Sequence, residues 1–246
     1  MDKYFKYLLE KFTEIKQKEW IQSNSKSTGA IGITFEKELG LLENNSFYPD
    51  FSNIEIKCIS KKSRFPITLF SLSFDGPGPR ELRRIVDLYG YPDETFKDQN
   101  VLFAYLSCIH TYSIKSKYSF KLEVNRQEDK IYLVVYDMDH NIIDRTSFIY
   151  FGSIKTRLIT KMKNLAIIYG DKSLKNNISF YKYTNILLYT LKDFNTFLTL
   201  LENGEIQANI AFRINKSAHH FGKLSSKNIV FTISKDKLDK LYNKLN

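Results

Sequence analysis

The sequence predicts a domain of the mixed α/β (α+β) class, in which helices and strands alternate along the chain. Some segments repeat apolar residues every three or four positions, which is the spacing of a helix with one buried face. Other segments alternate apolar and polar residues, as half-buried strands do. Hydrophobic residues make up 43% and charged residues 26% of the 246 residues, so fibrous and wholly disordered chains are excluded.

In the first half of the chain, spacing distinguishes the helices from the strands. Phe5, Leu8 and Phe12 mark the first helix, whereas Ile54 and Ile56 alternate with polar neighbours in the first strand. The predicted elements are a helix over 3–20, a helix over 31–42, a strand over 54–58, a strand over 67–73, a turn over 75–79, a helix over 81–89 and a strand over 101–110.

In the second half, the polar segment 125–129 separates two strands and is typical of a hairpin. Asn203-Gly204 is a favoured helix end, and Ser234 is a favoured cap for a last, basic helix. The predicted elements are strands over 118–124 and 130–137, a helix over 151–163, a strand over 165–170, a helix over 191–202, strands over 206–214 and 228–233, and the last helix. The chain contains no internal repeat, so one unit of lobed shape is expected.

The charge balance favours a polyanionic partner. Lys and Arg number 37 against 27 Asp and Glu, which gives a net charge of +10. No apolar run approaches the roughly 18 to 20 residues of a membrane span, and residues 1–12 do not have the pattern of a signal peptide. The cysteines are Cys58 and Cys108, which fits a reducing compartment. We therefore expect a cytoplasmic protein with no membrane partner.

Three polar residues near the first strand have the chemistry of a phosphodiesterase. Asp50 precedes the strand, and Glu55 and Lys57 are two residues apart within it, so the latter two side chains share one face. Two carboxylates can share a divalent cation of the Mg²⁺ type, while the ammonium group orients a water or stabilises charge on a phosphate oxygen. The alternative is an ordinary Glu-x-Lys pair on an amphipathic edge strand, preceded by an aspartate in a turn.

The segments around these residues resemble the MvaI/BcnI branch of type II restriction endonucleases. This branch belongs to the PD-(D/E)xK nucleases and is similar to the mismatch-repair nickase MutH. The resemblance rests on Gly29 to Glu36 with its Thr-Phe-Glu ending, on Pro49-Asp50-Phe51 and on Ile54 to Cys58. It extends with lower specificity to Leu69-Phe70, Arg80, Tyr89-Gly90 and residues 202–206.

The resemblance implies a fold, an activity and roles for four residues. The expected fold is a PD-(D/E)xK core of mixed sheet flanked by helices, within one nuclease domain over 1–246. Its catalytic core would cover about 1–170, and a recognition lobe over about 171–246 would complete the DNA cleft. Asp50 and Glu55 would bind the metal, Lys57 would position the attacking water, and Glu36 would add a carboxylate near the metal. For Glu36 the alternative is a solvated position on the helix face.

The implied activity is that of a type II restriction endonuclease that hydrolyses DNA phosphodiesters at a specific sequence. The cofactor would be Mg²⁺, for which Mn²⁺ can substitute, and the partner would be double-stranded DNA. The resemblance further implies a monomer that nicks each strand in turn, and a cognate DNA methyltransferase acting on the same site. The alternatives are a MutH-like nicking endonuclease of repair and a DNA-binding protein whose carboxylates are structural.

Candidate DNA contacts lie in two basic segments. The polar loop between the last two strands concentrates hydrogen-bond donors, which suit base edges in the major groove. Its candidates are Arg213, Lys216, His219, His220 and Lys223. The alternative is a basic surface hairpin that contacts phosphates without discrimination.

The second basic segment follows the Gly-Pro turn and contains Arg80, Arg83 and Arg84. All three are interpreted as contacts to the DNA backbone, with Arg80 and Arg83 as the chosen candidates, and the alternative for Arg83 and Arg84 is a solvated helix face. The chain has Ser225 to Asn228 where the resembling enzymes carry a His-Asp-His-Gly-like stretch, so the target sequence does not carry over.

Overall fold

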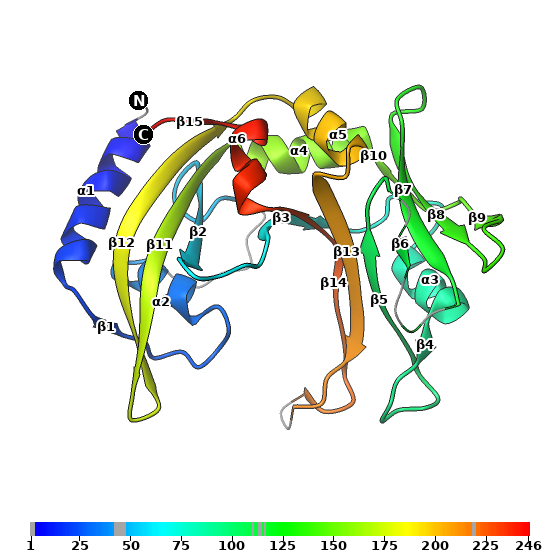
Figure 1. The fold of residues 1–246 in the computed structure, drawn as a ribbon, viewed down its shortest axis with the longest axis horizontal. Helices are drawn as coiled ribbons and strands as arrows, with labels where there is room; N and C mark the ends of the chain where they lie inside the picture. Colours follow the sequence, from blue (N-terminus) through cyan, green and yellow to red (C-terminus); the bar gives the residue numbers. More distant parts are fainter. Residues whose placement is uncertain (1–2, 42–47, 110, 113–114, 116, 218–219) are drawn as a thin grey trace. The chain divides into compact units, whose positions relative to one another are not determined.

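The computed structural model describes residues 3–41, 48–109, 111–112, 115, 117–217 and 220–246. Its chain forms two compact units, which interleave along the sequence. Unit 1 comprises Met1–Phe65, Arg157–Lys192 and Asp239–Asn246, and unit 2 comprises Pro66–Thr156 and Asp193–Leu238. Each unit is compact in itself (Figure 1).

Unit 1 is built on a mixed sheet with the strand order β1-β12-β11-β2, and β15 pairs with β12. Strands β2 and β11 are parallel, whereas the other pairs are antiparallel. A parallel pair requires a crossover connection, and here most of unit 2 lies in the sequence between the two strands. The elements are α1 Lys3–Gln17, β1 Ile21–Gln22, α2 Ala30–Glu38, β2 Ile54–Ser60, β11 Asn164–Lys175, β12 Ile178–Leu191 and β15 Tyr242–Lys244. Helices α4 (Phe151–Lys161) and α6 (Leu238–Leu241) each begin in unit 2 and end in unit 1.

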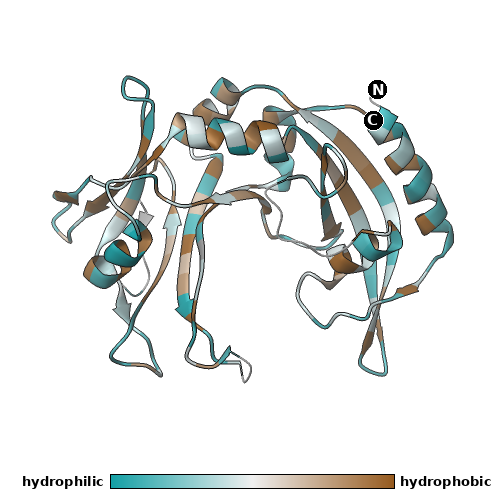
Figure 2. Ribbon diagram, turned by 180° about the vertical axis from the view of Figure 1, so that it is seen from behind, coloured by the Kyte–Doolittle hydropathy of each residue, from teal (hydrophilic) through white to brown (hydrophobic). Residues whose placement is uncertain are grey.

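The core of unit 1 lies between helices α1 and α2 and one face of this sheet. Phe5 and Phe12 of α1 and Phe35 of α2 are buried there against Ile54 and Ile56 of β2. Figure 2 shows hydrophobic residues along the middle of β11 and β12 and hydrophilic residues at the tip of their hairpin. The even-numbered residues of β2 therefore face the core, and Glu55 and Lys57 lie on the opposite face.

Unit 2 contains two further sheets. One has the order β10-β8-β7-β6, with β9 paired to β8, and the other has the order β3-β14-β13-β5-β4. Phe70, Phe197 and Phe231 pack together beside the second sheet, with ring centroids 5.1 to 6.0 Å apart. The elements are β3 Ile67–Leu72, α3 Glu81–Tyr89, β4 Tyr91–Pro92, β5 Asn100–Leu106, β6 Thr111–Tyr112, β7 Ser119–Asn125, β8 Lys130–Tyr136, β9 Ile142–Asp144, β10 Phe148–Tyr150, α5 Phe194–Glu202, β13 Ile206–Ile214, β14 Leu224–Ile233 and the 3₁₀ helix Lys235–Lys237.

The predicted α+β class is confirmed, and the structure adds one long element that was not predicted. Strand β12 has 14 residues and fills the centre of the unit 1 sheet. The last helix is shorter than expected, because a 3₁₀ turn comes first. Ser234 stands at the cap position, but its hydroxyl donates to Asp236 and accepts no hydrogen bond from a backbone N–H of the helix.

The two compact units do not follow the predicted division near residue 170. Residues 66–156 belong to unit 2, and residues 171–192 and 239–246 belong to unit 1. The cause is the hairpin of β11 and β12, which keeps the chain in the first sheet well past residue 170. Within the described part of the chain, no helix combines the length and the apolar character required to cross a membrane.

Candidate active site

Strand β2 brings two of the predicted residues together on one face. Lys57 donates a hydrogen bond from Nζ to Oε1 of Glu55, two residues away in the same strand. Strand β11 lies alongside in parallel register, with Leu165 opposite Glu55 and Ile167 opposite Lys57. The Glu55 side chain is only 1% exposed, whereas that of Lys57 is 27% exposed. An ammonium group within reach of solvent therefore lies beside a buried carboxylate.

Asp50 is held next to this pair by a tight turn at the entrance of β2. Phe51 and Ile54 exchange both of their backbone hydrogen bonds, at 3.0 and 2.8 Å. Between them Ser52 takes a positive φ of 54°. The turn directs Oδ2 of Asp50 back to the strand, where it accepts a hydrogen bond of 3.0 Å from the backbone N–H of Ile56.

The charges of this cluster act directly on Glu55. Burial raises the pKa of the Glu55 carboxyl, the ammonium group of Lys57 lowers it, and the negative charge of Asp50 raises it again, with a net upward shift. Two neighbouring carboxylates in a poorly hydrated place repel each other. A bound cation would relieve this repulsion.

The residues present fit a hard divalent cation. Oε2 of Glu55 is buried and accepts no hydrogen bond from the described residues, so this oxygen has a lone pair to offer. Carboxylate oxygens are the donors that Mg²⁺ takes, usually one or two of them with water and substrate phosphate completing the shell. The described residues assemble no group of three or more His, Cys, Asp or Glu side chains suited to a metal ion. Asp50 and Glu55 would therefore hold such an ion together with water and phosphate oxygens.

Helix α4 adds two cations that the sequence analysis did not select. Nζ of Lys161 lies 3.5 Å from Oε2 of Glu55, and the Lys161 side chain is 15% exposed. Arg157, one helical turn earlier, is close enough for the charge of Glu55 to raise its pKa, although burial lowers that pKa by more. In the sequence, the only signal for these two residues was their spacing, because Arg157 and Lys161 lie four residues apart just before a predicted strand. Its relevance depends on the parallel pairing of β2 with β11, which local patterns do not reveal.

Glu36 lies near the same strand, on the side of helix α2. Burial raises the pKa of the Cys58 thiol, and the negative charges of Glu36 and Asp50 raise it further. Cys58 follows Lys57 directly, so both acids lie close to this part of β2. A buried thiol with a raised pKa is a poor nucleophile, and we therefore assign Cys58 no chemical role.

The neighbours of Glu36 in the Thr-Phe-Glu segment hold helix α2 in place. Thr34 donates to the backbone carbonyl of Ala30 at 2.7 Å. Phe35 is fully buried and contacts the ring of Tyr183, with centroids 4.9 Å apart. Tyr183 in turn donates from its hydroxyl to the carbonyl of Ile31 at 2.7 Å. Packing alone therefore accounts for Thr34 and Phe35.

In unit 2, four of the predicted DNA contacts lie exposed at or beside the β13–β14 connection. Arg213 is on β13, opposite Ser225 of β14. His220 and Lys223 share a tight turn, closed by a backbone hydrogen bond of 3.0 Å from Lys223 to His220. Lys216 forms an ion pair with Asp93 at 3.4 Å. His219 lies outside the described residues.

The arginines after the Gly-Pro turn differ in their surroundings. Arg80 takes a positive φ of 63° at the start of α3. Arg83 is paired with Asp87 at 2.8 Å, and its guanidinium lies 5.7 Å from the ring of Phe212. Arg83 therefore already has an intramolecular partner, whereas Arg80 forms no ion pair with the described residues.

Arg84 serves the fold of unit 2. Its guanidinium donates to Glu81 at 2.7 Å, to Asp144 at 2.7 Å and to Ser147 at 3.0 Å, which joins α3 to β9 and the segment before β10. Burial opposes ionisation of Asp144, but the hydrogen bonds from Arg84 and Thr146 outweigh it and lower the pKa of Asp144 to about 2. Arg84 thus forms salt bridges with two buried carboxylates, those of Glu81 and Asp144. This structural role accounts for Arg84 without a DNA contact.

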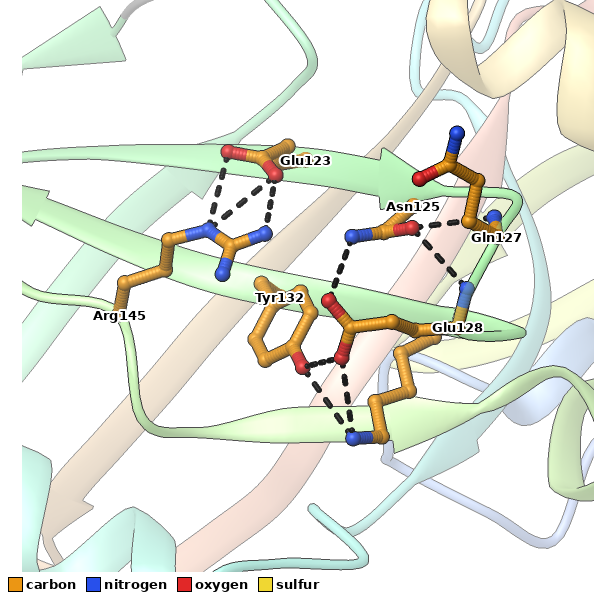
Figure 3. A network of polar contacts seen from close by, with 7 residues as sticks. Glu123, Asn125, Gln127, Glu128, Tyr132 and Arg145 are labelled. Carbon is orange, nitrogen blue, oxygen red and sulfur yellow. Dashed lines mark hydrogen bonds and ion pairs between the residues drawn. The ribbon is translucent and has the colours of Figure 1, made fainter.

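Cations on the β7–β8 hairpin of unit 2 and directly after β9 are likewise paired within the chain (Figure 3). Nη2 of Arg145 lies 2.5 Å from Oε1 of Glu123. Lys130 lies 3.2 Å from Glu128, and the Tyr132 hydroxyl donates to the same carboxylate. These contacts pair the local positive charges with carboxylates of the same chain.

Comparisons with known proteins give one family and two similar solved structures. The profile of the MvaI/BcnI restriction endonuclease family matches residues 9–242. A solved structure of restriction endonuclease MvaI in complex with cognate DNA substrate is similar over 100% of this chain and 98% of that one, with a TM-score of 0.92 and 28% identity. A structure of MvaI in the absence of DNA has the same coverage, with a TM-score of 0.63 and 26% identity. No curated protein sequence matches the chain.

Proposed function

The chain belongs to the MvaI/BcnI restriction endonuclease family and is a type II site-specific deoxyribonuclease, and we propose that it cleaves DNA with Mg²⁺ held by Asp50 and Glu55. The observation that carries this proposal is the buried Oε2 of Glu55, which accepts no hydrogen bond from the described residues and lies in a cluster with Asp50 and Lys57. Mn²⁺, which also takes carboxylate ligands, can substitute.

In the proposed mechanism, each side chain of the cluster has a separate task. Asp50 and Glu55 supply the carboxylate oxygens for the ion, and the turn before β2 keeps Asp50 beside the strand. When bound, the ion polarises the phosphate and lowers the pKa of water. Lys57 donates a hydrogen bond to the attacking water and stabilises negative charge on the phosphate. Glu36 adds negative charge on the α2 side of β2.

The DNA contacts proposed for unit 2 are of two kinds. Arg213, Lys216, His219, His220 and Lys223 read base edges from the β13–β14 connection. Arg80 and Arg83 contact the DNA backbone, for which Arg83 has to exchange its ion pair with Asp87. The similarity to MvaI bound to its cognate DNA substrate supports DNA as the substrate here. We further propose that the protein acts in the cytoplasm as a monomer that nicks each strand in turn, beside a methyltransferase that protects the same site.

The test is incubation of the purified protein with unmethylated plasmid and phage DNA, in Mg²⁺ or in EDTA. We expect discrete fragments in Mg²⁺ and intact DNA in EDTA, and mapping the fragment ends gives the target sequence. Nicked circles as the only product would favour a MutH-like nickase. Intact DNA that is still shifted on a gel, with every divalent metal tried, would favour a non-catalytic DNA-binding protein.

A further inference from the structure

A group of exposed cations lies in unit 1 just beyond the end of β2. Lys61, Lys62 and Arg64 occupy the loop that follows this strand, and Lys175 ends strand β11; all four are exposed. We call these four residues the distal basic strip. Asp171 is the neighbouring carboxylate, 3.9 Å from Nζ of Lys61. Four positive charges less one negative charge leave +3, a sizeable part of the net +10 of the chain.

The strip has a defined position because both of its segments are anchored to the sheet. Strands β2 and β11 pair as far as Ser60 and Gly170, after which β11 continues to Lys175 paired with β12 alone. Asn176 and Asn177 close that hairpin with positive φ of 49° and 61°, the conformation of a tight two-residue turn. The contact between Lys61 and Asp171 joins the loop to the hairpin.

Lys175 lies on the same face of the sheet as the proposed catalytic cluster. Leu165 and Ile167 are opposite Glu55 and Lys57, and alternate residues of a strand share one face. Lys175 follows Ile167 by an even number of residues. The irregularity near Tyr169 falls on the β12 side of the pairing, so the alternation in β11 is unbroken. Lys172, on the same hairpin, lies on the opposite face.

The spacing along the strands fits DNA that continues past the cleaved bond. At about 3.3 Å per residue, Ser60 is roughly 10 Å from Lys57, and Lys175 is roughly 26 Å from Ile167. A duplex rises about 3.4 Å per base pair. With the duplex axis parallel to these strands, the strip would face phosphates about three to eight base pairs away from the cleaved one.

We propose that the distal basic strip binds the phosphate backbone of the flanking DNA on one side of the cleaved phosphodiester. This inference rests on the proposed function, because it places the reacting phosphate at Asp50, Glu55 and Lys57. Contacts of this kind carry no sequence information, but they add affinity and hold the duplex in register. Their contribution therefore depends on how far the duplex extends beyond the target.

The test compares Lys62→Ala/Lys175→Ala with Lys172→Ala as the matched control from the other face. Affinity is measured in EDTA, on a long duplex centred on the mapped target and on a short one that ends within two base pairs of it. On the long duplex we expect the double variant to bind about tenfold more weakly at moderate salt, and the slope of log K against log salt to fall by about two. On the short duplex it should bind like wild type, as should Lys172→Ala on both.

Equal slopes for the double variant and wild type on the long duplex would overturn the proposal, as would an equal loss in Lys172→Ala. Failure of the strip is distinguishable from failure of the proposed function. If wild type still cuts plasmid in Mg²⁺ while the double variant binds normally, the strip alone is wrong. If wild type does not cut, the catalytic proposal is wrong whatever the affinities are.

Discussion

Replacement of Lys57 by alanine is expected to slow DNA cleavage about 10³-fold, since a positioned group that handles a proton or a developing charge contributes on this scale. Lys57 is the partly exposed cation of the cluster and donates to Oε1 of the buried Glu55. Single-turnover cleavage of the mapped target in Mg²⁺ measures the effect. DNA affinity in EDTA should change by less than about threefold, because one phosphate contact at most is lost.

Lys16→Ala is the control for this experiment, because Lys16 lies on the exposed side of helix α1 in the same unit. This variant should cleave at the wild-type rate. A Lys57→Ala protein that cuts within tenfold of wild type would remove Lys57 from the mechanism. The catalytic ammonium would then have to come from another residue, with Lys161 the nearest alternative at Glu55.

Replacement of Lys161 by methionine is expected to lower the melting temperature of the metal-free protein by about 5 °C. Its ammonium group lies 3.5 Å from Oε2 of Glu55, the oxygen that accepts no hydrogen bond from the described residues. Loss of one partner from a buried ion pair leaves an uncompensated charge, although Lys57 still compensates part of it here. A divalent ion at Oε2 would supply the missing positive charge, so the loss should shrink when Mn²⁺ is added.

The measurement is thermal unfolding of wild type and variant in EDTA and in Mn²⁺. The gain on adding Mn²⁺ should be larger in Lys161→Met than in wild type, because an ion that binds the folded state stabilises it. Lys155→Met, on an exposed position of the same helix, should show the wild-type gain. If Lys161→Met lowers the melting temperature by the same amount in EDTA and in Mn²⁺, Lys161 contributes packing only.

Local patterns were sufficient to predict most of the elements and the faces of β2. Apolar spacing located α1 and α3, and the alternation around Glu55 placed it beside Lys57, as the ion pair bears out. Strand β12 was missed because its burial is irregular: buried positions at Tyr181 and Tyr183 are followed by a bulge that shifts the alternation. When a bulge interrupts the two-residue alternation of a strand, the sequence pattern indicates the strand only weakly.

What the sequence did not reveal depends on contacts between distant segments. Lys161 meets Glu55 only because β2 and β11 are parallel neighbours across a long insertion. Arg84 had two interpretations in the sequence, a DNA contact and a solvated face, but the structure gives it a third role in a salt bridge with Glu81 and Asp144. Both cases show that the partner of a charged residue is set by tertiary packing and not by its neighbours in the chain.

A divalent ion held by Asp50 and Glu55 can be located crystallographically. Crystals of the protein with target DNA and Mn²⁺ would be measured at a wavelength where manganese scatters anomalously. We expect a peak about 2 Å from a carboxylate oxygen of each residue, with Oε2 as the ligand from Glu55. A complex that cleaves its DNA in the crystal, with manganese bound elsewhere and none within coordination distance of either carboxylate, would contradict this expectation.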